Sequence, residues 1–263
     1  MNKGKIIVAG IGPGSEADIT PAVLAAIQSS DVIIGYKYYF RFITHLLREG
    51  TECIDTGMKR EQARAEQAFA YANEGKTVCV ISSGDAGIYG MTPLIYEMKK
   101  ESGSEIEIES YPGISAFQKA ASLLGAPIGH DFCVISLSDL MTPWELIEKR
   151  IHAAAMADFV TAIYNPKSEG RYWQLYRLKE LFLQERKPET RSVMYVRPEG
   201  GARSIRHYAR RSGPRADRYV YGSLDRKLTN ISFRESYDHS PGILWRDQTK
   251  ENGYGYRTGH HDP

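Results

Sequence analysis

The sequence predicts an α/β protein made of two α/β domains, of which the second is incomplete. Strand-like and helix-like segments alternate along residues 5–196, a pattern typical of a parallel sheet with helices on both faces. Beyond Arg197 the alternation stops, and the chain is rich in Arg, Ser, Gly, Asp and Tyr. We therefore expect one domain at residues 1–124, a partial second domain at 125–196, and an aberrant, poorly ordered tail at 197–263.

The strands and helices of the first domain are predicted from the apolar and alanine-rich segments that its glycines separate. Lys5–Ala9 is rich in β-branched residues, and Thr20-Pro21 supplies a hydroxyl cap and a proline for the first turn of a helix. The alanine-rich segment at 62–74 is predicted to be helical and to end at Gly75. The expected strands are 5–9, 31–35, 77–82 and 105–111, and the expected helices are 22–29, 62–74, 92–100 and 115–124.

The second domain begins after a boundary near Leu124–His130. Thr142–Glu145 has the spacing of a capping box, which predicts a helix from there to about Ala155. The remaining expected elements are strands at 131–137, 159–164 and 192–196 and a helix at 172–184.

Composition excludes several classes of protein. The chain has 34 Lys and Arg against 32 Asp and Glu, so its net charge of +2 gives no support for a nucleic-acid-binding protein. No apolar run approaches the roughly 20 residues that cross a bilayer, and the first residues lack a secretory apolar stretch. The three cysteines form no CxxC pair, and the isolated histidines have no metal-ligand spacing. We expect a cytoplasmic protein with no disulfide framework, membrane segment or metal site.

Glycine-rich loops follow three of the predicted strands. Gly10–Ser15 (GIGPGS) departs from the dinucleotide-binding pattern because Pro13 interrupts it and the helix begins only near Thr20. Taken alone, this loop is as well explained as a structural turn.

The other two loops are Ser82–Gly90 (SSGDAGIYG) and Tyr111–Ala116 (YPGISA). Asp85 lies between glycines, where its carboxylate either binds ribose hydroxyls or a cationic group, or caps a tight turn. Since the carboxyl ends of parallel strands meet at one edge of a sheet, three such loops predict a ligand site there.

Together these three motifs resemble the tetrapyrrole methylase family. Five further segments resemble its precorrin-3B C(17)-methyltransferase branch, which belongs to cobalamin biosynthesis and includes the enzymes that act on cobalt-precorrin-3. They are Gly35–Lys37, Thr56–Met58, His130–Cys133, Ser136–Leu140 with Thr142–Trp144, and Tyr164–Ser168. The resemblance runs from about Lys5 to Val196.

The resemblance implies a homodimeric S-adenosylmethionine-dependent methyltransferase with a cofactor cleft between its two domains. It identifies no catalytic residue and implies no metal. The lysine and arginine candidates for the substrate carboxylates are Lys37, Arg41 and Lys59, each of which is equally well explained as a solvated surface charge. Ser136 and Asp139 are further substrate candidates. The residues expected on the cofactor are Gly12, Pro13, Gly14, Gly84, Asp85, Ile88, Ser115, Ala116 and Tyr164.

The resemblance breaks after Val196, where the family's closing segments are absent. A shift of the reading frame by one base would restore them: the codons of Asp238–Leu244 can be written so that the shifted frame reads ITPRGYY. Asp225–Ser232 can likewise become IGNSQTYR. We therefore hypothesise a frameshift near Arg197, in the gene or in its sequencing, with a genuinely divergent tail as the alternative. The tail should then add few strands and leave an uncovered sheet edge after Val196.

Two other functions stay open at this point. One is methylation of a different ring carbon, against which the segment Ser136–Trp144 argues. The other is an inactive remnant that binds the cofactor but does not transfer the methyl group.

Overall fold

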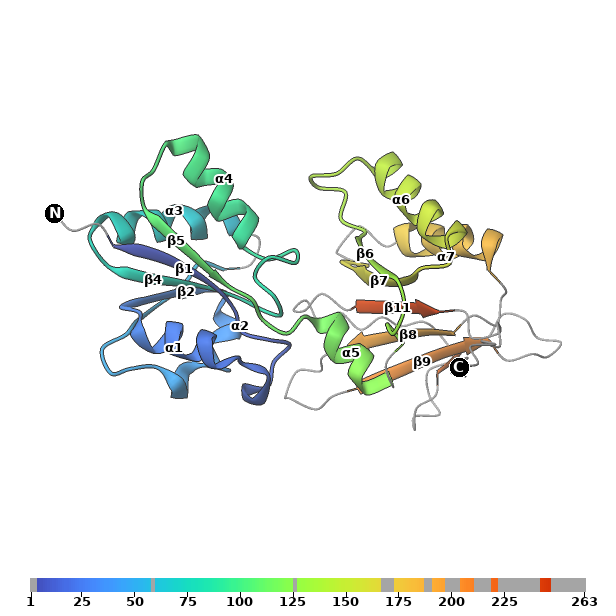
Figure 1. Ribbon diagram of the computed structural model, residues 1–263, viewed down its shortest axis with the longest axis horizontal. Coiled ribbons are helices and arrows are strands. Elements are labelled where there is room, and N and C mark those ends of the chain that lie inside the picture. Colours follow the sequence, from blue (N-terminus) through green and yellow to red (C-terminus); the bar gives the residue numbers. More distant parts are fainter. Residues whose placement is uncertain are drawn as a thin grey trace, which may run out of the picture. The chain divides into compact units, whose positions relative to one another are not determined.

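The computed structural model describes residues 4–57, 60–124, 127–166, 173–186, 191–196, 204–210, 219–221 and 242–246. The chain divides into two compact units, with the division after Gly125. Each unit holds one β-sheet, and each is described by itself below (Figure 1).

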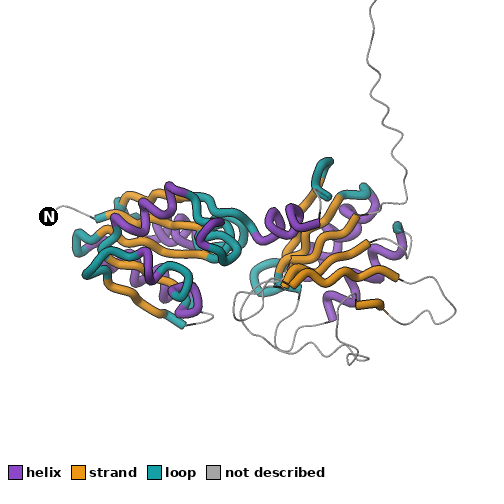
Figure 2. Tube along the Cα trace, turned by 90° about the horizontal axis from the view of Figure 1, so that it is seen from below, coloured by secondary structure: helices purple, strands orange, loops and turns teal. Residues whose placement is uncertain are grey.

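The first unit is built on a five-stranded, wholly parallel sheet, with strand order β3-β2-β4-β1-β5. The strands run side by side in Figure 2. The three central strands consist almost entirely of buried residues, as expected for a parallel sheet covered on both faces. The strands are β1 (Lys5–Gly10), β2 (Val32–Gly35), β3 (Glu52–Asp55), β4 (Thr77–Ser82) and β5 (Glu107–Tyr111).

Helices cover both faces of this sheet (Figure 1). On one face α3 and α4 enclose a core around Val8, Val80 and Phe69, and on the other α1 packs on Ile7, Ile33 and Ile81. The helices are α1 (Pro21–Ser29), α2 (Lys37–Phe40), α3 (Glu61–Asn73), α4 (Thr92–Ser102) and α5 (Ala116–Leu124), with short 3-10 turns at Glu16–Asp18 and Thr44–Leu46.

Local sequence signals explain the ends of these helices. The Thr20 hydroxyl accepts a hydrogen bond from the Val23 N–H (3.3 Å) ahead of Pro21, which confirms the predicted start of α1. The chain leaves α4 through Gly103 at φ 63°, a left-handed conformation that favours glycine. Strand β3 and helix α2, which are only four residues long, were not predicted from the sequence.

The second unit has a six-stranded mixed sheet, with strand order β10-β9-β8-β11-β7-β6. Helices α6 and α7 lie on the same face of it (Figure 1), where Ile147, Ile151 and Phe182 form a core with Ile135 and Ile163. The elements are β6 (Phe132–Ser136), α6 (Trp144–Met156), β7 (Val160–Tyr164), α7 (Trp173–Glu185), β8 (Arg191–Val196), β9 (Ser204–Arg210), β10 (Tyr219–Tyr221) and β11 (Gly242–Arg246).

Two expectations about the tail are wrong for its described residues. Three strands beyond Val196 join the sheet, and β8 pairs with β9 on one side and β11 on the other, so no edge is left after Val196. Strand β11 lies between β7 and β8 in the second sheet. The local sequence is compatible with these strands: Ser204–Arg210 has Ile, His and Ala at every second position, and Gly242–Arg246 contains three consecutive apolar residues.

The central position of β11 argues against the frameshift hypothesis. The codon correspondence at Asp225–Ser232 and Asp238–Leu244 argues for it. The other residues of 197–263 lie outside the described residues. Within the described segments, no helix combines the length and the hydrophobicity that a membrane span requires.

Candidate functional site

The candidate site in the first unit lies at the carboxyl edge of the parallel sheet, where the loops after β1, β4 and β5 meet. Backbone hydrogen bonds join Gly12 and Gly84 in both directions, at 3.1 and 2.8 Å. A Cβ atom on Gly113 would lie 2.2 Å from the Gly84 carbonyl oxygen and 2.3 Å from that of Gly10. Only glycine permits this approach, so the three glycine motifs are needed to bring the loops together.

Asp85 holds two of these loops together. One carboxylate oxygen accepts hydrogen bonds from the N–H groups of Gly87 (2.8 Å) and Ile88 (2.9 Å), and the other accepts one from Gly113 (3.0 Å). The carboxylate therefore caps its own turn and also fixes the position of the loop after β5. This geometry gives Asp85 an organising role at the edge.

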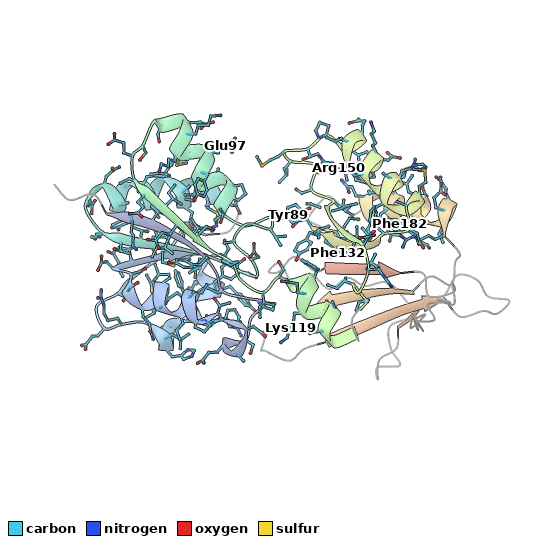
Figure 3. The ribbon with its side chains drawn as sticks, viewed as in Figure 1. Tyr89, Glu97, Lys119, Phe132, Arg150 and Phe182 are labelled. Carbon is cyan, nitrogen blue, oxygen red and sulfur yellow. The ribbon has the colours of Figure 1, made fainter. Side chains whose placement is uncertain are left out.

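The loop between Asp85 and α4 exposes apolar side chains. Ile88 and Tyr89 are 37% and 51% exposed, and Tyr89 points away from the loop in Figure 3. Its backbone has φ 55°, which is unusual for an aromatic residue. The turn that follows is tight, since a Cβ on Gly90 would lie 2.4 Å from the Ala86 carbonyl oxygen.

An ion pair that the sequence analysis missed connects α5 with the first loop. The Lys119 ammonium, labelled in Figure 3, donates to an Asp18 carboxylate oxygen at 2.7 Å. The side chains of this pair are only 17% and 9% exposed. At the start of α5, the Ser115 N–H donates to the Gln118 side-chain oxygen (2.8 Å). Together these contacts hold the buried Ser115 beside the glycine loops.

The loops after β2 and β3 also end at this edge. Asp55 accepts hydrogen bonds from the N–H groups of Lys37 (3.0 Å) and Gly57 (2.9 Å). The Lys37 side chain is exposed, and the exposed Arg41 guanidinium lies over the Tyr38 ring, 4.4 Å from its centroid. Lys59, the third predicted partner of substrate carboxylates, lies outside the described residues.

A buried arginine completes the edge. Arg64 of α3 is 5% exposed, and its guanidinium donates to the Thr56 hydroxyl (3.0 Å) and the Gly57 carbonyl (3.0 Å). Arg64 was not among the predicted site residues, although the sequence contains a signal for its burial. Arg64 stands four and eight residues before Ala68 and Ala72, and therefore on the buried stripe of an alanine-rich helix.

In the second unit, polar side chains gather at the carboxyl ends of β6 and β7. The Ser136 hydroxyl accepts hydrogen bonds from the Asn165 amide (2.9 Å) and the Ser138 N–H (3.1 Å). Asn165 has φ 49°, a left-handed conformation that asparagine tolerates better than most residues. The fully buried Gln174 of α7 donates to Asp139 at 3.2 Å. Asn165 and Gln174 are therefore polar residues of this edge that the sequence analysis did not single out.

The structure thus distributes the predicted site residues over both units. Tyr164, at the end of β7, and the substrate candidates Ser136 and Asp139 belong to the second unit. Lys37 belongs to the first unit. The cofactor candidates that the structure brings to one edge of the first unit are Gly12, Pro13, Gly14, Gly84, Asp85, Ile88, Ser115 and Ala116.

The cysteines are unsuited to nucleophilic chemistry. Burial raises the pKa of the Cys79 thiol to about 12 and also raises the pKa of Cys53 and Cys133 above the ordinary value. A thiol with a raised pKa is less ionised at neutral pH, and the thiolate is the reactive form. Among the residues that the structure describes, no group of three His, Cys, Asp or Glu side chains is arranged to hold a metal ion.

Comparison with known proteins gives the class to which this fold and site belong. Residues 5–203 match the family Tetrapyrrole (Corrin/Porphyrin) Methylases, and the chain belongs to that family. Its members are methyltransferases that use S-adenosylmethionine as methyl donor.

Two similar proteins are both named as methyltransferases of cobalt-factor III. The chain is 55% identical to the cobalt-factor III methyltransferase of Priestia megaterium over 194 residues, which are 72% of this chain and 35% of that protein. It is 48% identical to the probable cobalt-factor III C(17)-methyltransferase of Salmonella typhimurium over 186 residues, 70% of this chain and 76% of the relative. The chain therefore spans about a third of the first protein and three quarters of the second.

Solved structures show the same fold. The crystal structure of the methyltransferase CobJ has a TM-score of 0.75 and 34% identity, covering 93% of this chain and 95% of CobJ. A uroporphyrin-III C-methyl transferase from Thermus thermophilus, solved with S-adenosylhomocysteine, has a TM-score of 0.60 and 15% identity, with 92% of each chain covered. At that identity the second likeness shows the fold alone.

Proposed function

We propose that this chain methylates C17 of a corrin precursor, cobalt-factor III or precorrin-3B, in cobalamin biosynthesis. The observation that carries the proposal is the 48% identity to the Salmonella typhimurium C(17)-methyltransferase over three quarters of that protein's length. The three glycine loops that meet at one sheet edge support the proposal physically. Loops of this kind allow the protein backbone to approach a bound ligand closely.

The residues at this edge fit S-adenosylmethionine. The loops offer backbone polar groups and small residues, which suit an amino-acid carboxylate, an ammonium group and a ribose. When bound, this cofactor supplies an electrophilic methyl group on a sulfonium centre, and an attack in line with the breaking S–C bond transfers it to carbon.

The task of the chain's own residues is to hold donor and acceptor in line. Asp85 fixes the loops after β4 and β5 relative to each other through its three N–H contacts. The Lys119–Asp18 pair holds α5 against the loop after β1. We assign Pro13, Gly84, Asp85, Ile88, Ser115, Ala116 and Tyr164 to the cofactor, together with the flanking Gly12 and Gly14. Positioning alone can supply much of the rate of a two-reactant step.

Lys37, Ser136 and Asp139 are the residues we assign to the tetrapyrrole. The tetrapyrrole carries several carboxylates, and the exposed Lys37 ammonium is suited to pair with one of them. The Ser136 hydroxyl and the Asp139 carboxylate instead offer hydrogen bonds from the polar cluster of the second unit.

Methyl transfer from S-adenosylmethionine labelled in its methyl group tests the proposal. We expect label to appear in precorrin-3B or in its cobalt-bound counterpart, and C17 to be identified as the site by NMR. Label in uroporphyrinogen III but in neither of these substrates would assign the chain to another branch of the family.

The second candidate, a remnant that binds the cofactor without turnover, would bind S-adenosylhomocysteine in calorimetry and transfer no label to any of the three rings. The break in family resemblance after Val196 is the observation that favours it. We also propose that the protein works as a homodimer in the cytoplasm. Sedimentation of the purified protein and cell fractionation test these two points.

A further inference from the structure

The buried guanidinium of Arg64 has no anionic partner among the residues that the structure describes. Its Nε–H donates to the Thr56 hydroxyl, one Nη2–H to the Gly57 carbonyl, and one Nη1–H to the Met91 sulfur at 3.6 Å. All three acceptors are neutral. Among the described residues, no carboxylate oxygen lies within the 4 Å of an ion pair with Arg64.

Leaving a buried charge without a counter-ion is costly, so buried arginines are generally paired with an acid. Here the arginine is 5% exposed and lies in the first turn of α3, where the helix dipole adds positive potential. Asp55, the acid at the end of β3, is exposed and accepts from the N–H groups of Lys37 and Gly57 instead. The guanidinium of Arg64 is therefore left without an acidic partner among these residues.

The arginine connects two loops of the carboxyl edge. Thr56 and Gly57 follow β3, whereas Met91 ends the loop that contains Asp85 and directly precedes α4. A guanidinium has five N–H groups, and the three contacts leave two of them for a further acceptor. A carboxylate would supply both the missing charge and a planar pair of oxygens.

We propose that Arg64 is the anchor for a carboxylate of a ligand bound at the carboxyl edge of the first sheet. This rests on the proposed function, which supplies two sources of that group: the acidic side chains of the tetrapyrrole and the methionine carboxylate of the cofactor. The first source is favoured, since two of the three Arg64 contacts are made to the Thr56–Gly57 loop after β3, which β2 and β4 separate from β1.

The test compares Arg64→Gln with wild type in binding two probes, S-adenosylhomocysteine by calorimetry and cobalt-factor III by absorbance titration. We expect the dissociation constant for the tetrapyrrole to rise by about 30-fold or more, the usual effect of leaving one charge of a buried pair alone, while that for S-adenosylhomocysteine changes less than about twofold. A rise for S-adenosylhomocysteine instead would support the anchor and assign it to the cofactor.

Controls separate this inference from other failures. Lys100→Gln removes an exposed charge from the other end of α4 and should leave both constants unchanged. Arg64→Lys keeps the charge without the planar fork and should give an intermediate loss; it replaces Arg64→Gln if that variant does not melt cooperatively. Unchanged binding of both probes by a folded variant overturns the inference. Failure of the wild type to bind any tetrapyrrole would overturn the proposed function instead.

Discussion

The two units build their strand-end edges by different means. In the first unit, backbone touches backbone: Gly10, Gly84 and Gly113 approach so closely that no side chain fits between them. In the second unit, side chains make the contacts, through Ser136 to Asn165 and through Gln174 to Asp139. We call the first of these the glycine edge and the second the side-chain edge. The glycine edge tolerates almost no substitution. At the side-chain edge a single substitution removes one contact, at the cost of about one hydrogen bond.

The largest expected effect concerns the reading frame in the second unit. A chain expressed with the frame shifted by one base after Val196 should show higher soluble yield, a higher melting temperature and faster methyl transfer than the chain as written. Resequencing of the gene around the codons of Val196–Pro198 checks the origin of the difference. Equal stability and activity of the two chains would favour a genuinely divergent tail.

The glycine edge of the first unit predicts a severe effect for Gly113→Ala. The new Cβ would meet two carbonyl oxygens at 2.2 and 2.3 Å, so we expect a loss of about 3 kcal/mol or more in the free energy of unfolding, together with loss of S-adenosylhomocysteine binding. Gly50→Ala is the control, because nothing lies within 4 Å of its Cβ, so that its φ of 83° leaves it with a backbone cost and no steric clash. Urea denaturation should show the larger loss for Gly113→Ala, and equal losses would contradict the close approach.

Asp85→Ala should have an intermediate effect. It leaves the N–H groups of Gly87, Ile88 and Gly113 without their acceptor, so we expect S-adenosylhomocysteine to bind more weakly by about 1–3 kcal/mol. Asp85→Asn keeps one acceptor oxygen and should lose less. Calorimetry on both variants checks the order, and unchanged affinity in Asp85→Ala would remove this residue from the organisation of the site.

The side-chain edge predicts a smaller effect for Ser136→Ala. This change removes the acceptor of the Asn165 amide and the Ser138 N–H, at a cost of about 1 kcal/mol in stability. Since Ser136 is assigned to the tetrapyrrole, KM for the tetrapyrrole should rise while KM for S-adenosylmethionine stays constant. A change confined to the cofactor KM would move Ser136 to the other ligand.

The smallest effect concerns an ion pair on the first sheet. Lys5 of β1 donates to Glu109 of β5 at 2.6 Å, and this hydrogen bond, followed by one from Tyr111, lowers the pKa of the Glu109 carboxyl. A lowered pKa stabilises the fold above the unfolded-state pKa of about 4.3 and loses that contribution as the pH falls through the folded-state value. Lys5, whose pKa the same contact raises, loses its contribution only in strongly alkaline solution.

Glu109→Gln should therefore destabilise the protein by roughly 0.2–1 kcal/mol at pH 7 and by less at pH 3, because the pair is partly solvated. Thermal unfolding at the two pH values measures the difference. A variant that loses the same amount at both values would show that packing, and not charge, accounts for its effect.

Much of the first unit was predictable because its signals are local. The β-branched run at Lys5–Ala9, the Thr20-Pro21 start of α1 and the strand at 77–82 each depend on neighbours in the sequence. The tail was not predictable in the same way. Strand β11 depends on pairing with β7 and β8, and its pairing partners lie far away in the sequence.

The residues of the candidate site also differ in how far local sequence predicted them. Glycine motifs revealed the edge of the first unit, since only glycine allows the loops to meet. Arg64, Lys119 and Gln174 were missed because their importance arises from distant partners such as Met91, Asp18 and Asp139. The burial of a charged side chain can be predicted from the sequence only where helical spacing places that residue among small apolar residues, as with Arg64.

The position of β11 between β7 and β8 determines the order in which the strands can pair during synthesis. During synthesis, the first sheet and the β6–β7 pair emerge complete from the ribosome, but β7 and β8 gain their shared neighbour only after Gly242 has been made. Until then both strands present open backbone, and such an interval favours recruitment by chaperones or pairing with other nascent chains. The late, long-range closure also predicts that the second sheet forms more slowly than the first.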